Sequence, residues 1–265
     1  MSRSPETPAP AEGRELKLCG MAAVRARFQR DAKSISRLYF DYETGRKIGL
    51  MCKALAAARK IYRCVEPREL EKIAGTMHHG GIVAVVAETP LRPATQAELA
   101  AWARRKEPIL VLDRVGNPHN LGAIARTAAF FGVTRLVIPD DPAAARPTEA
   151  AYRVAEGGME HIDIRSAPAA AAFLRDLAAA GYDVVGAAAH AAAGVPPPRP
   201  SVPKDSRTAT PIALVLGNEE HGLSAPVAAA CTRLVTIPGR DQVESLNVSA
   251  AAAVLIWELF GAGLK

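Results

Sequence analysis

Polar residues able to bind or orient a substrate occur in three short segments of the second half of the chain. Asn120 and Arg126 lie at the start of one expected helix, Glu219 follows an apolar strand, and Ser245 and Asn247 precede the last helix. In parallel α/β sheets, ligands bind beyond the carboxyl ends of the strands, where such loops meet. At that edge, Arg126 is expected to contact a phosphate or another part of a substrate.

Four of these five residues also have a purely structural explanation. Asn120 is a natural N-cap for its helix, Ser245 and Asn247 are candidate caps of the last helix, and a lone arginine usually lies on a surface. The loop at residues 217–224 (GNEEHGLS) imitates a phosphate-binding P-loop, but it has leucine where lysine is required. Its two glutamates would repel a triphosphate, so the loop favours a zwitterionic or cationic ligand.

Short apolar runs alternate with helical segments from residue 109 onward, which predicts a parallel sheet covered by helices on both faces. Strands are expected at 109–113, 135–139, 183–187, 212–216 and 234–238. Helices are expected near 120–131, 168–180 and 248–260. The proline-rich run at 194–203 is expected as a surface loop that cannot join the sheet.

The first part of the chain predicts a smaller α/β/α domain. Helical patterns alternate there with apolar runs at 35–42, 60–65 and 82–87. Residues 1–13, rich in proline, glutamate and alanine, are expected as a disordered tail. The division is therefore a tail at 1–13, a small domain at 14–87, a linker with a short helix at 88–107, and a second domain at 108–265.

The excess of positive over negative charge lies entirely in the first part of the chain. Residues 1–107 contain 20 lysines and arginines against 12 acidic residues, whereas residues 108–265 contain 13 against 15. This asymmetry favours a module that binds a polyanion, and a solvated basic surface is the alternative. The candidate residues for contacting such a polyanion are the basic side chains Arg25, Arg27, Arg30, Lys33, Arg46, Lys47 and Arg59.

Other classes of function find little support in the sequence. The 265 residues contain no apolar run long enough to cross a membrane, and four cysteines without a CxxC pair favour a reduced, cytoplasmic protein. Six scattered histidines without an HExxH motif predict no metal site. The lack of GxGxxG after an early strand argues against a dinucleotide-binding dehydrogenase.

The second domain resembles the SpoU (TrmH-like) RNA methyltransferases of the SPOUT superfamily. The resemblance rests on three segments in the family's order and spacing: NPHNLGAIARTAAFFG, LVLGNEEHGLS and IPGRDQVESLNVSAAAAVLIWEL. The basic first domain, with the sequence HGGI at 79–82, is similar to the small RNA-binding domain that often precedes this catalytic domain. That small domain is akin to certain large-subunit ribosomal proteins.

This resemblance implies a knotted (trefoil) α/β domain, a homodimer, S-adenosylmethionine as methyl donor without a metal, and methylation of a ribose 2′-hydroxyl in rRNA or tRNA. The alternative is a non-catalytic RNA- or ribosome-binding assembly factor that keeps the fold. By position in the motifs, the catalytic residues would be Asn120, Arg126, Glu219, Ser245 and Asn247. The donor would be held by Leu216, Gly217, Ile237, Pro238 and Leu246.

Two segments depart from the family's usual pattern. Residues 239–241 (GRD) follow Pro238 where relatives usually have methionine and then a glycine, and Glu156 stands where serine is common.

Because free arginine stays protonated, we expect Arg126 to bind a phosphate and orient the hydroxyl. Family mechanisms propose instead that Arg126 removes the hydroxyl proton.

The last helix, at 248–260, is apolar nearly all round. Val254 and Trp257 lie off the stripe that would face the sheet, so one sheet cannot cover the whole helix. The alanines at 250–253 allow close approach of another backbone. The helix therefore predicts a two-fold contact with a second copy of the chain.

Overall fold

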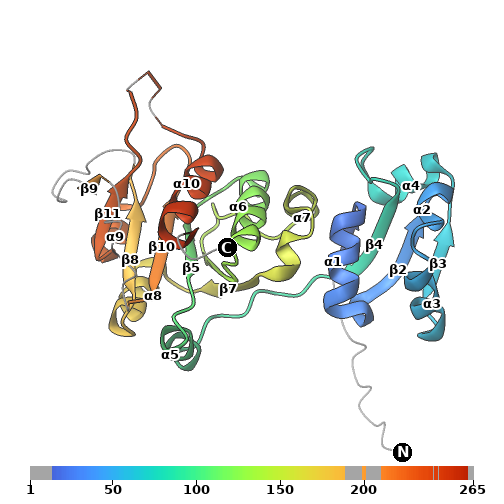
Figure 1. Cartoon of the computed structure of the whole chain (residues 1–265), viewed down its shortest axis with the longest axis horizontal. Helices are drawn as coiled ribbons and strands as arrows, with labels where there is room; N and C mark the ends of the chain where they lie inside the picture. The colour runs from blue at the N-terminus through green and yellow to red at the C-terminus, as the bar shows by residue number, and fades with distance from the viewer. Residues whose placement is uncertain (1–13, 189–198, 201–209, 241, 244, 262–265) are drawn as a thin grey trace, which may run out of the picture.

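The computed structural model describes residues 14–188, 199–200, 210–240, 242–243 and 245–261, and these form two α/β units (Figure 1). The expected tail at 1–13 lies outside the described residues. The smaller unit extends from β1 to β4, and the larger one from α5 to α10. No helix in the described part of the chain has the length and apolar character needed to cross a bilayer.

The small domain is a four-stranded sheet with helices on both faces. Its elements are β1 (Glu15–Cys19), α1 (Met21–Asp31), β2 (Ile35–Phe40), α2 (Tyr42–Gly45), α3 (Gly49–Ala57), β3 (Ile61–Cys64), α4 (Pro67–Ala74) and β4 (Ile82–Ala87). The strand order is β1-β4-β2-β3, and only β2 and β3 pair in parallel. The strand β1 was not expected, because its short ELKLC pattern becomes a strand only by pairing with the buried β4.

The large domain contains a seven-stranded parallel sheet in the order β7-β6-β5-β10-β8-β11-β9. Its strands are β5 (Ile109–Asp113), β6 (Arg135–Pro139), β7 (Asp163–Ala167), β8 (Asp183–Ala187), β9 (Arg199–Pro200), β10 (Ile212–Gly217) and β11 (Arg233–Thr236). Its helices are α5 (Gln96–Arg104), α6 (Pro118–Phe130), α7 (Glu149–Ala155), α8 (Ala170–Ala179), α9 (Ala225–Ala230) and α10 (Val248–Phe260). The predicted parallel sheet is therefore confirmed.

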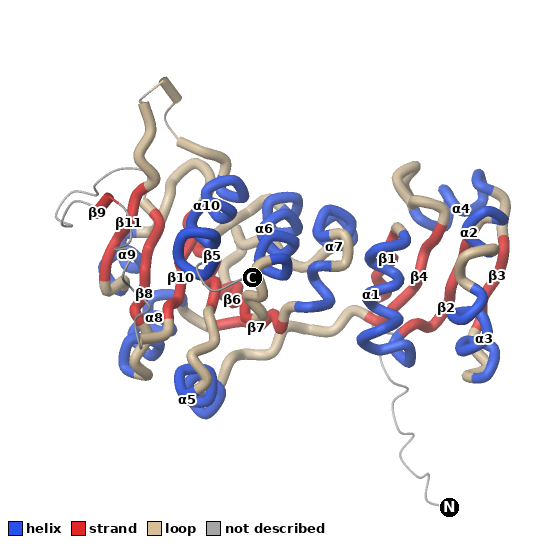
Figure 2. Tube along the Cα trace, viewed as in Figure 1, coloured by secondary structure: helices blue, strands red, loops and turns tan. Residues whose placement is uncertain are grey.

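The central strand β5 shows how the large sheet separates two cores. Alternate side chains of a strand point to opposite faces. The helices α6, α7 and α10 lie on one side of the large sheet, and α5, α8 and α9 lie on the other (Figure 2). Leu110 and Leu112 accordingly join the core with the first group, while Ile109 and Val111 join the core with the second. Burial of each such apolar side chain contributes about 1.5–3 kcal/mol. Two covered faces explain why the strands read as unbroken apolar runs in the sequence.

The structure adds elements that the sequence pattern did not predict. The strand β7 and the helices α7 and α9 fall in segments with weak periodicity. The helix α7 nevertheless contributes buried residues to the core that contains Leu110 and Leu112. Within the expected linker at 88–107, α5 begins after a Thr95–Glu98 capping box. Its Leu99 and Trp102 are buried in the second core, so this helix packs as part of the large domain.

The prediction that the run at 194–203 cannot join the sheet was wrong at two residues. Arg199 and Pro200 pair in parallel with β11 as the outermost strand. An edge strand tolerates proline because one side of its backbone has no neighbouring strand to donate to. The rest of that run lies outside the described residues.

The end of the chain returns across the sheet to reach its final position. The strand β11 lies beyond β8, yet α10 packs against α6 and β10 (Figure 1). On α10, Ala252, Leu255 and Ile256 are buried, whereas Val254 and Trp257 are exposed, as the helical stripe predicted. This return brings the loop before α10 to the carboxyl edge of β5 and β10.

Candidate active site

Three loops meet at the carboxyl edge of the large sheet through a chain of side-chain hydrogen bonds. The Asn120 Nδ2 donates to Glu219 Oε1 at 2.7 Å, and the Asn247 Nδ2 donates to Asn120 Oδ1 at 3.2 Å. The three residues come from α6, from the loop after β10 and from the start of α10. Three of the five residues singled out as catalytic are thus joined in one network.

Asn120 does not cap its helix. The helix α6 begins at Pro118 after Asn117, whose side chain accepts a hydrogen bond from the His119 N–H at 2.9 Å. Because Asn117 provides the cap, the buried Asn120 is left to pair with side chains of the other loops. The capping explanation for Asn120 was therefore wrong.

Asn247 caps α10 and joins the network at the same time. Its Oδ1 accepts from the Ser249 N–H at 2.9 Å and from the Ser249 Oγ at 2.6 Å, while its Nδ2 points to Asn120. The two ends of one amide therefore connect the helix start to the site. Both the structural and the functional explanation of Asn247 apply.

The loop that carries Glu219 is held rigidly. The Asn218 Oδ1 accepts from the backbone N–H groups of Glu220 and His221, both at 3.0 Å, and the Asn218 Nδ2 donates to the carbonyl of Arg114 at 2.8 Å. The second carboxylate oxygen of Glu219 accepts from the Gly116 N–H at 3.3 Å. These contacts place Glu219 between the loops after β5 and β10.

Gly217 is required by the backbone of this loop. A Cβ atom there would lie 2.3 Å from the carbonyl carbon of Gly222 and 2.4 Å from the Leu223 nitrogen. The residues Asn218 and Gly222 form a backbone bridge directly beside it. Any side chain at Gly217 would open the loop and move Glu219.

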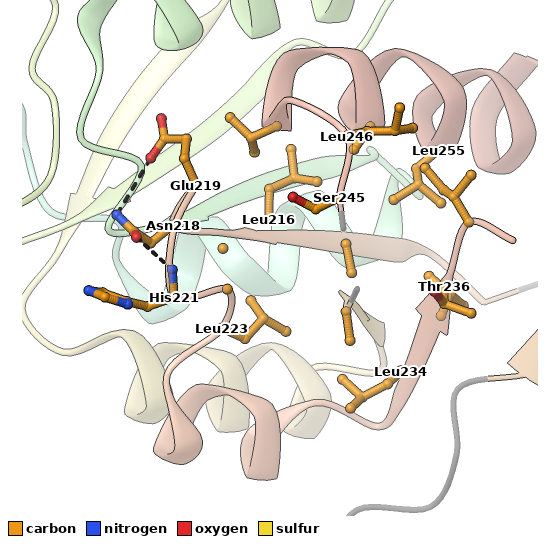
Figure 3. Close-up of a pocket in the computed structure, with 18 of the residues that line it drawn as sticks. Leu216, Asn218, Glu219, His221, Leu223, Leu234, Thr236, Ser245, Leu246 and Leu255 are labelled. Atoms are coloured by element: carbon orange, nitrogen blue, oxygen red, sulfur yellow. Dashed lines mark hydrogen bonds between the residues drawn. The ribbon is translucent and has the colours of Figure 1, made fainter. Parts of the chain in front are cut away.

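A cavity of about 510 Å³ lies beside this network (Figure 3). Leucines from several elements form its apolar wall, and Glu219, Asn218 and His221 lie together at one end. A volume of this size is within the roughly 300–1,000 Å³ usual for small-molecule sites. The lining residues that the sequence analysis singled out are Leu216, Gly217, Glu219, Ile237, Ser245 and Leu246.

Pro238 is the one donor-site candidate that lies elsewhere. Pro238 is exposed and does not line the cavity, and the following Gly239 and Arg240 are also exposed. The structure adds Leu223, Leu234 and Thr236 to the wall. Leu234 and Thr236 belong to β11, so reading residues within the strand as well as the loop after it would have found them.

The residues of the cavity fit S-adenosylmethionine. Leu223, Leu234 and Leu255 offer an apolar surface for an adenine ring, and Ser245 offers a hydroxyl (Figure 3). The carboxylate of Glu219 at the polar end matches the positive charge of a sulfonium or ammonium group.

Arg126 lies outside the hydrogen-bond network and points toward solvent. Its side chain is 56% exposed, and its Nη2 forms an ion pair with the Glu156 Oε2 at 2.9 Å. Sequence reasoning placed Arg126 away from the apolar stripe of α6, which the structure confirms. The ion pair was not predicted, because Glu156 is 30 residues away in the sequence.

Two arginines among the RNA-binding candidates make contacts that join the two domains. The Arg27 Nε donates to the Glu160 Oε1 at 2.9 Å, and the Arg30 Nη1 donates to the Glu160 carbonyl at 2.8 Å. The Glu160 side chain is 1% exposed and the Arg27 side chain 16%. Burial raises the pKa of Glu160, while Arg27 opposes this shift. Arg27 therefore has little surface left for a phosphate.

The other basic candidates lie on the surface of the small domain. Arg27 is partly buried, whereas these residues are exposed. Exposed residues in this group are Arg25, Lys33, Arg46, Lys47 and Arg59.

The described part of the molecule shows no cluster for a metal ion, and burial keeps two of its cysteine thiols protonated. No three histidine, cysteine or acidic residues there are arranged to hold a metal ion. Burial raises the pKa of Cys19 to about 11 and that of Cys231 to about 12, so neither thiol is ionised near neutral pH.

Comparison with known proteins assigns both domains. Residues 107–257 match the SpoU rRNA Methylase family, and residues 17–91 match the RNA 2′-O ribose methyltransferase substrate binding family. The chain belongs to the SpoU rRNA methylase family, which confirms the resemblance seen in its three motifs.

Related proteins and solved structures extend over nearly the whole chain. A 23S rRNA (guanosine-2′-O-)-methyltransferase RlmB from Nitrosomonas europaea is 34% identical over 244 residues, covering 91% of this chain and 89% of that protein. YfiF from Escherichia coli O157:H7, an uncharacterized tRNA/rRNA methyltransferase, is 33% identical over 92% of this chain and 67% of its own length. The AdoMet-bound rRNA methyltransferase from Sinorhizobium meliloti has the same fold, with a TM-score of 0.75 at 23% identity, covering 95% and 89% of the two chains.

Proposed function

We propose that this protein transfers a methyl group from S-adenosylmethionine to a ribose 2′-hydroxyl of large-subunit ribosomal RNA. The observation that carries the proposal is the hydrogen-bond chain from Glu219 through Asn120 to Asn247 beside a ligand-sized cavity that Glu219 lines. RlmB proteins from Nitrosomonas europaea and Ralstonia nicotianae, named for guanosine 2′-O-methylation of 23S rRNA, match over 91% of this chain and support the choice of RNA.

The cavity supplies the donor site. S-adenosylmethionine carries a methyl group on a positive sulfonium, ready for transfer to a nucleophile. Displacement at that methyl group requires the attacking oxygen, the carbon and the sulfur in line, so the protein's main contribution is orientation. Leu216, Leu246 and the rigid Glu219 loop fix the donor side of this line.

Arg126 supplies the acceptor side. Its exposed guanidinium can bind an RNA phosphate through two parallel hydrogen bonds and so orient the adjacent ribose hydroxyl. A guanidinium keeps its proton at neutral pH, so the phosphate-binding role suits Arg126 better than that of a base. The small domain adds exposed cations, among them Arg46 and Lys47, that extend the RNA-binding surface. A ribosomal RNA substrate implies that the enzyme works in the cytoplasm.

The assay for this function uses in vitro transcribed 23S rRNA and methyl-labelled S-adenosylmethionine. Wild type is expected to label the transcript at one ribose, found by nucleotide mapping. Glu219→Gln is expected to lower transfer about 100-fold, because the new amide N–H₂ would face the Gly116 N–H and displace the loop. Asp176→Asn, on α8 across the sheet, is the matched control and should transfer normally. RNA binding without any labelling would favour the alternative of a non-catalytic assembly factor.

We also propose that the protein is a homodimer through α10 and that its C-terminal segment is knotted. The return of the chain from β11 across the sheet to α6 supports the knot. Exposed apolar side chains on adjacent helices support the dimer: Phe130 is 81% exposed, Trp257 is 59% exposed, and the Trp257 ring lies 5.7 Å from that of Phe131. Monomers rarely leave such a patch in water.

A charge in this patch tests the dimer. Val254→Glu should shift the protein from dimer to monomer in sedimentation at micromolar concentration, because burying an unpaired carboxylate opposes association. Donor binding is expected to fall with it, since α10 directly follows the loop that lines the cavity. Wild type that sediments as a monomer would contradict the dimer without affecting the proposed reaction.

A further inference from the structure

We infer that Glu156 is a positioning residue that occupies the Arg126 guanidinium in the free protein and is displaced by an RNA phosphate. This inference rests on the proposed role of Arg126 in binding RNA. The contact that motivates it is the ion pair between Arg126 Nη2 and Glu156 Oε2 at 2.9 Å. A carboxylate and a phosphate offer an arginine the same kind of charged acceptor oxygens.

The backbone at Glu156 is held in an unusual conformation that directs its side chain. Glu156 ends α7 with a positive φ of 45°, in the left-handed region that residues other than glycine rarely adopt. Such conformations persist only where the surrounding structure determines them, and they cluster at ligand-binding and switch sites.

The two glycines after Glu156 explain how this conformation is held. A Cβ at Gly158 would lie 2.8 Å from the Arg126 Cα, so this segment presses directly on α6. A Cβ at Gly157 would lie 3.0 Å from the Ala22 carbonyl oxygen of α1, on the opposite side. The segment is therefore wedged between α1 and α6, which fixes Glu156 beside Arg126.

The pair is suited to exchange and not to permanent support. The side chains of Arg126 and Glu156 are 56% and 57% exposed. Exposed ion pairs of this kind contribute little to stability and are screened by salt. An incoming phosphate, which brings more negative charge and further contacts along the RNA, can therefore take the place of the carboxylate. Until then, Glu156 keeps the guanidinium near its working position.

Exchange predicts a specific effect on RNA affinity. Glu156→Gln removes the competing anion, so binding of 23S rRNA transcript in the presence of S-adenosylhomocysteine should tighten about twofold to fivefold, the range of one exposed ion pair. The KM for RNA should fall with it, while kcat changes less than twofold. The slope of log affinity against log salt concentration should steepen by about 0.7–0.9, because one more cation becomes free to release counterions.

A double-mutant cycle tests whether the effect passes through Arg126. In an Arg126→Ala background, Glu156→Gln should no longer change RNA affinity. Glu156→Asn is a second variant, since asparagine tolerates positive φ, and thermal unfolding confirms that each variant is folded. Asp176→Asn controls for removal of one negative charge elsewhere.

The outcomes separate this inference from the proposed reaction. Unchanged or weaker RNA binding by both Glu156 variants overturns it, and so does an equal gain in the Arg126→Ala background or in Asp176→Asn. Wild type that binds the transcript but transfers no methyl group rejects the reaction alone, because the exchange is judged only from binding ratios.

Discussion

The short segment 156–160 has a glutamate at each end, and each glutamate pairs with an arginine. The two pairs differ sharply in burial. Glu160 pairs with Arg27 of the small domain, and the two side chains are 1% and 16% exposed. Glu156 pairs with Arg126 of α6, and both side chains are more than half exposed. Residue types and distances are nearly the same, at 2.8 Å and 2.9 Å.

Burial gives the two pairs different roles. Removing one partner of a buried pair leaves an uncompensated charge out of water, so the intact pair is necessary for stability. An exposed pair can break with little cost, which leaves its arginine available to a ligand. The Arg27–Glu160 pair therefore joins the domains, and the Arg126–Glu156 pair holds a group that we propose to bind RNA.

Loss of the exposed arginine should have the largest effect on activity. Arg126→Ala is expected to lower methyl transfer by about 10²–10³-fold, as removal of one positioned donor does in other enzymes. The free energy of unfolding should change by less than about 0.5 kcal/mol, as for most surface substitutions. Single-turnover assays and denaturant unfolding measure the two quantities. Retained turnover would contradict any role of Arg126 in the reaction.

Loss of the buried acid should show the reverse pattern. Glu160→Ala is expected to lower the free energy of unfolding by up to about 3–5 kcal/mol, because the partly buried Arg27 loses its charged partner. Denaturant unfolding measures this loss, and proteolysis at residues 88–95 reports whether the domains separate. Affinity for S-adenosylmethionine, measured by calorimetry, should stay close to that of wild type. A stable Glu160→Ala variant with intact domain contact would remove the distinction between the pairs.

The buried acid also predicts a pH dependence of the stability. Burial raises the pKa of Glu160 above its ordinary 4.5, so the folded state holds this proton to higher pH than the unfolded state does. Its contribution is fully present below about 4.5 and is lost as pH rises through the folded pKa. The stability of wild type relative to Glu160→Gln should therefore decrease over that interval. Unfolding titrations from pH 4 upward measure it, and a rising difference would be inconsistent with the assigned cause.

The smallest expected effect is on the salt dependence of RNA binding, and it differs between two basic residues of the small domain. Lys47→Ala should weaken RNA binding uniformly and reduce the salt slope by about 0.7–0.9, because the exposed Lys47 can neutralise one phosphate. Arg27→Ala should leave the salt slope unchanged, since its guanidinium is already paired with Glu160. Equal slopes for both variants would show that burial does not decide which cations meet RNA.

The sequence by itself determined most of the large domain and which loops form its candidate site. Unbroken apolar strands and the helical stripes of α6 and α10 specified a parallel sheet, because burial on two faces leaves a local signature. The three ordered motifs indicated the family. The network residues Asn120, Glu219 and Asn247 were found in the same way, since each lies in a loop at a predicted strand end or at a helix start.

Only the tertiary structure decided what each charged residue touches. Arg27 and Lys47 look alike in the sequence, yet Arg27 is partly buried against Glu160 and Lys47 is exposed. The partners Arg27–Glu160 and Arg126–Glu156 are separated by 133 and 30 residues, so no local pattern connects them. Pairing of side chains depends on how whole elements pack, and a basic residue reads the same in the sequence whether its charge is used inside the protein or left for RNA.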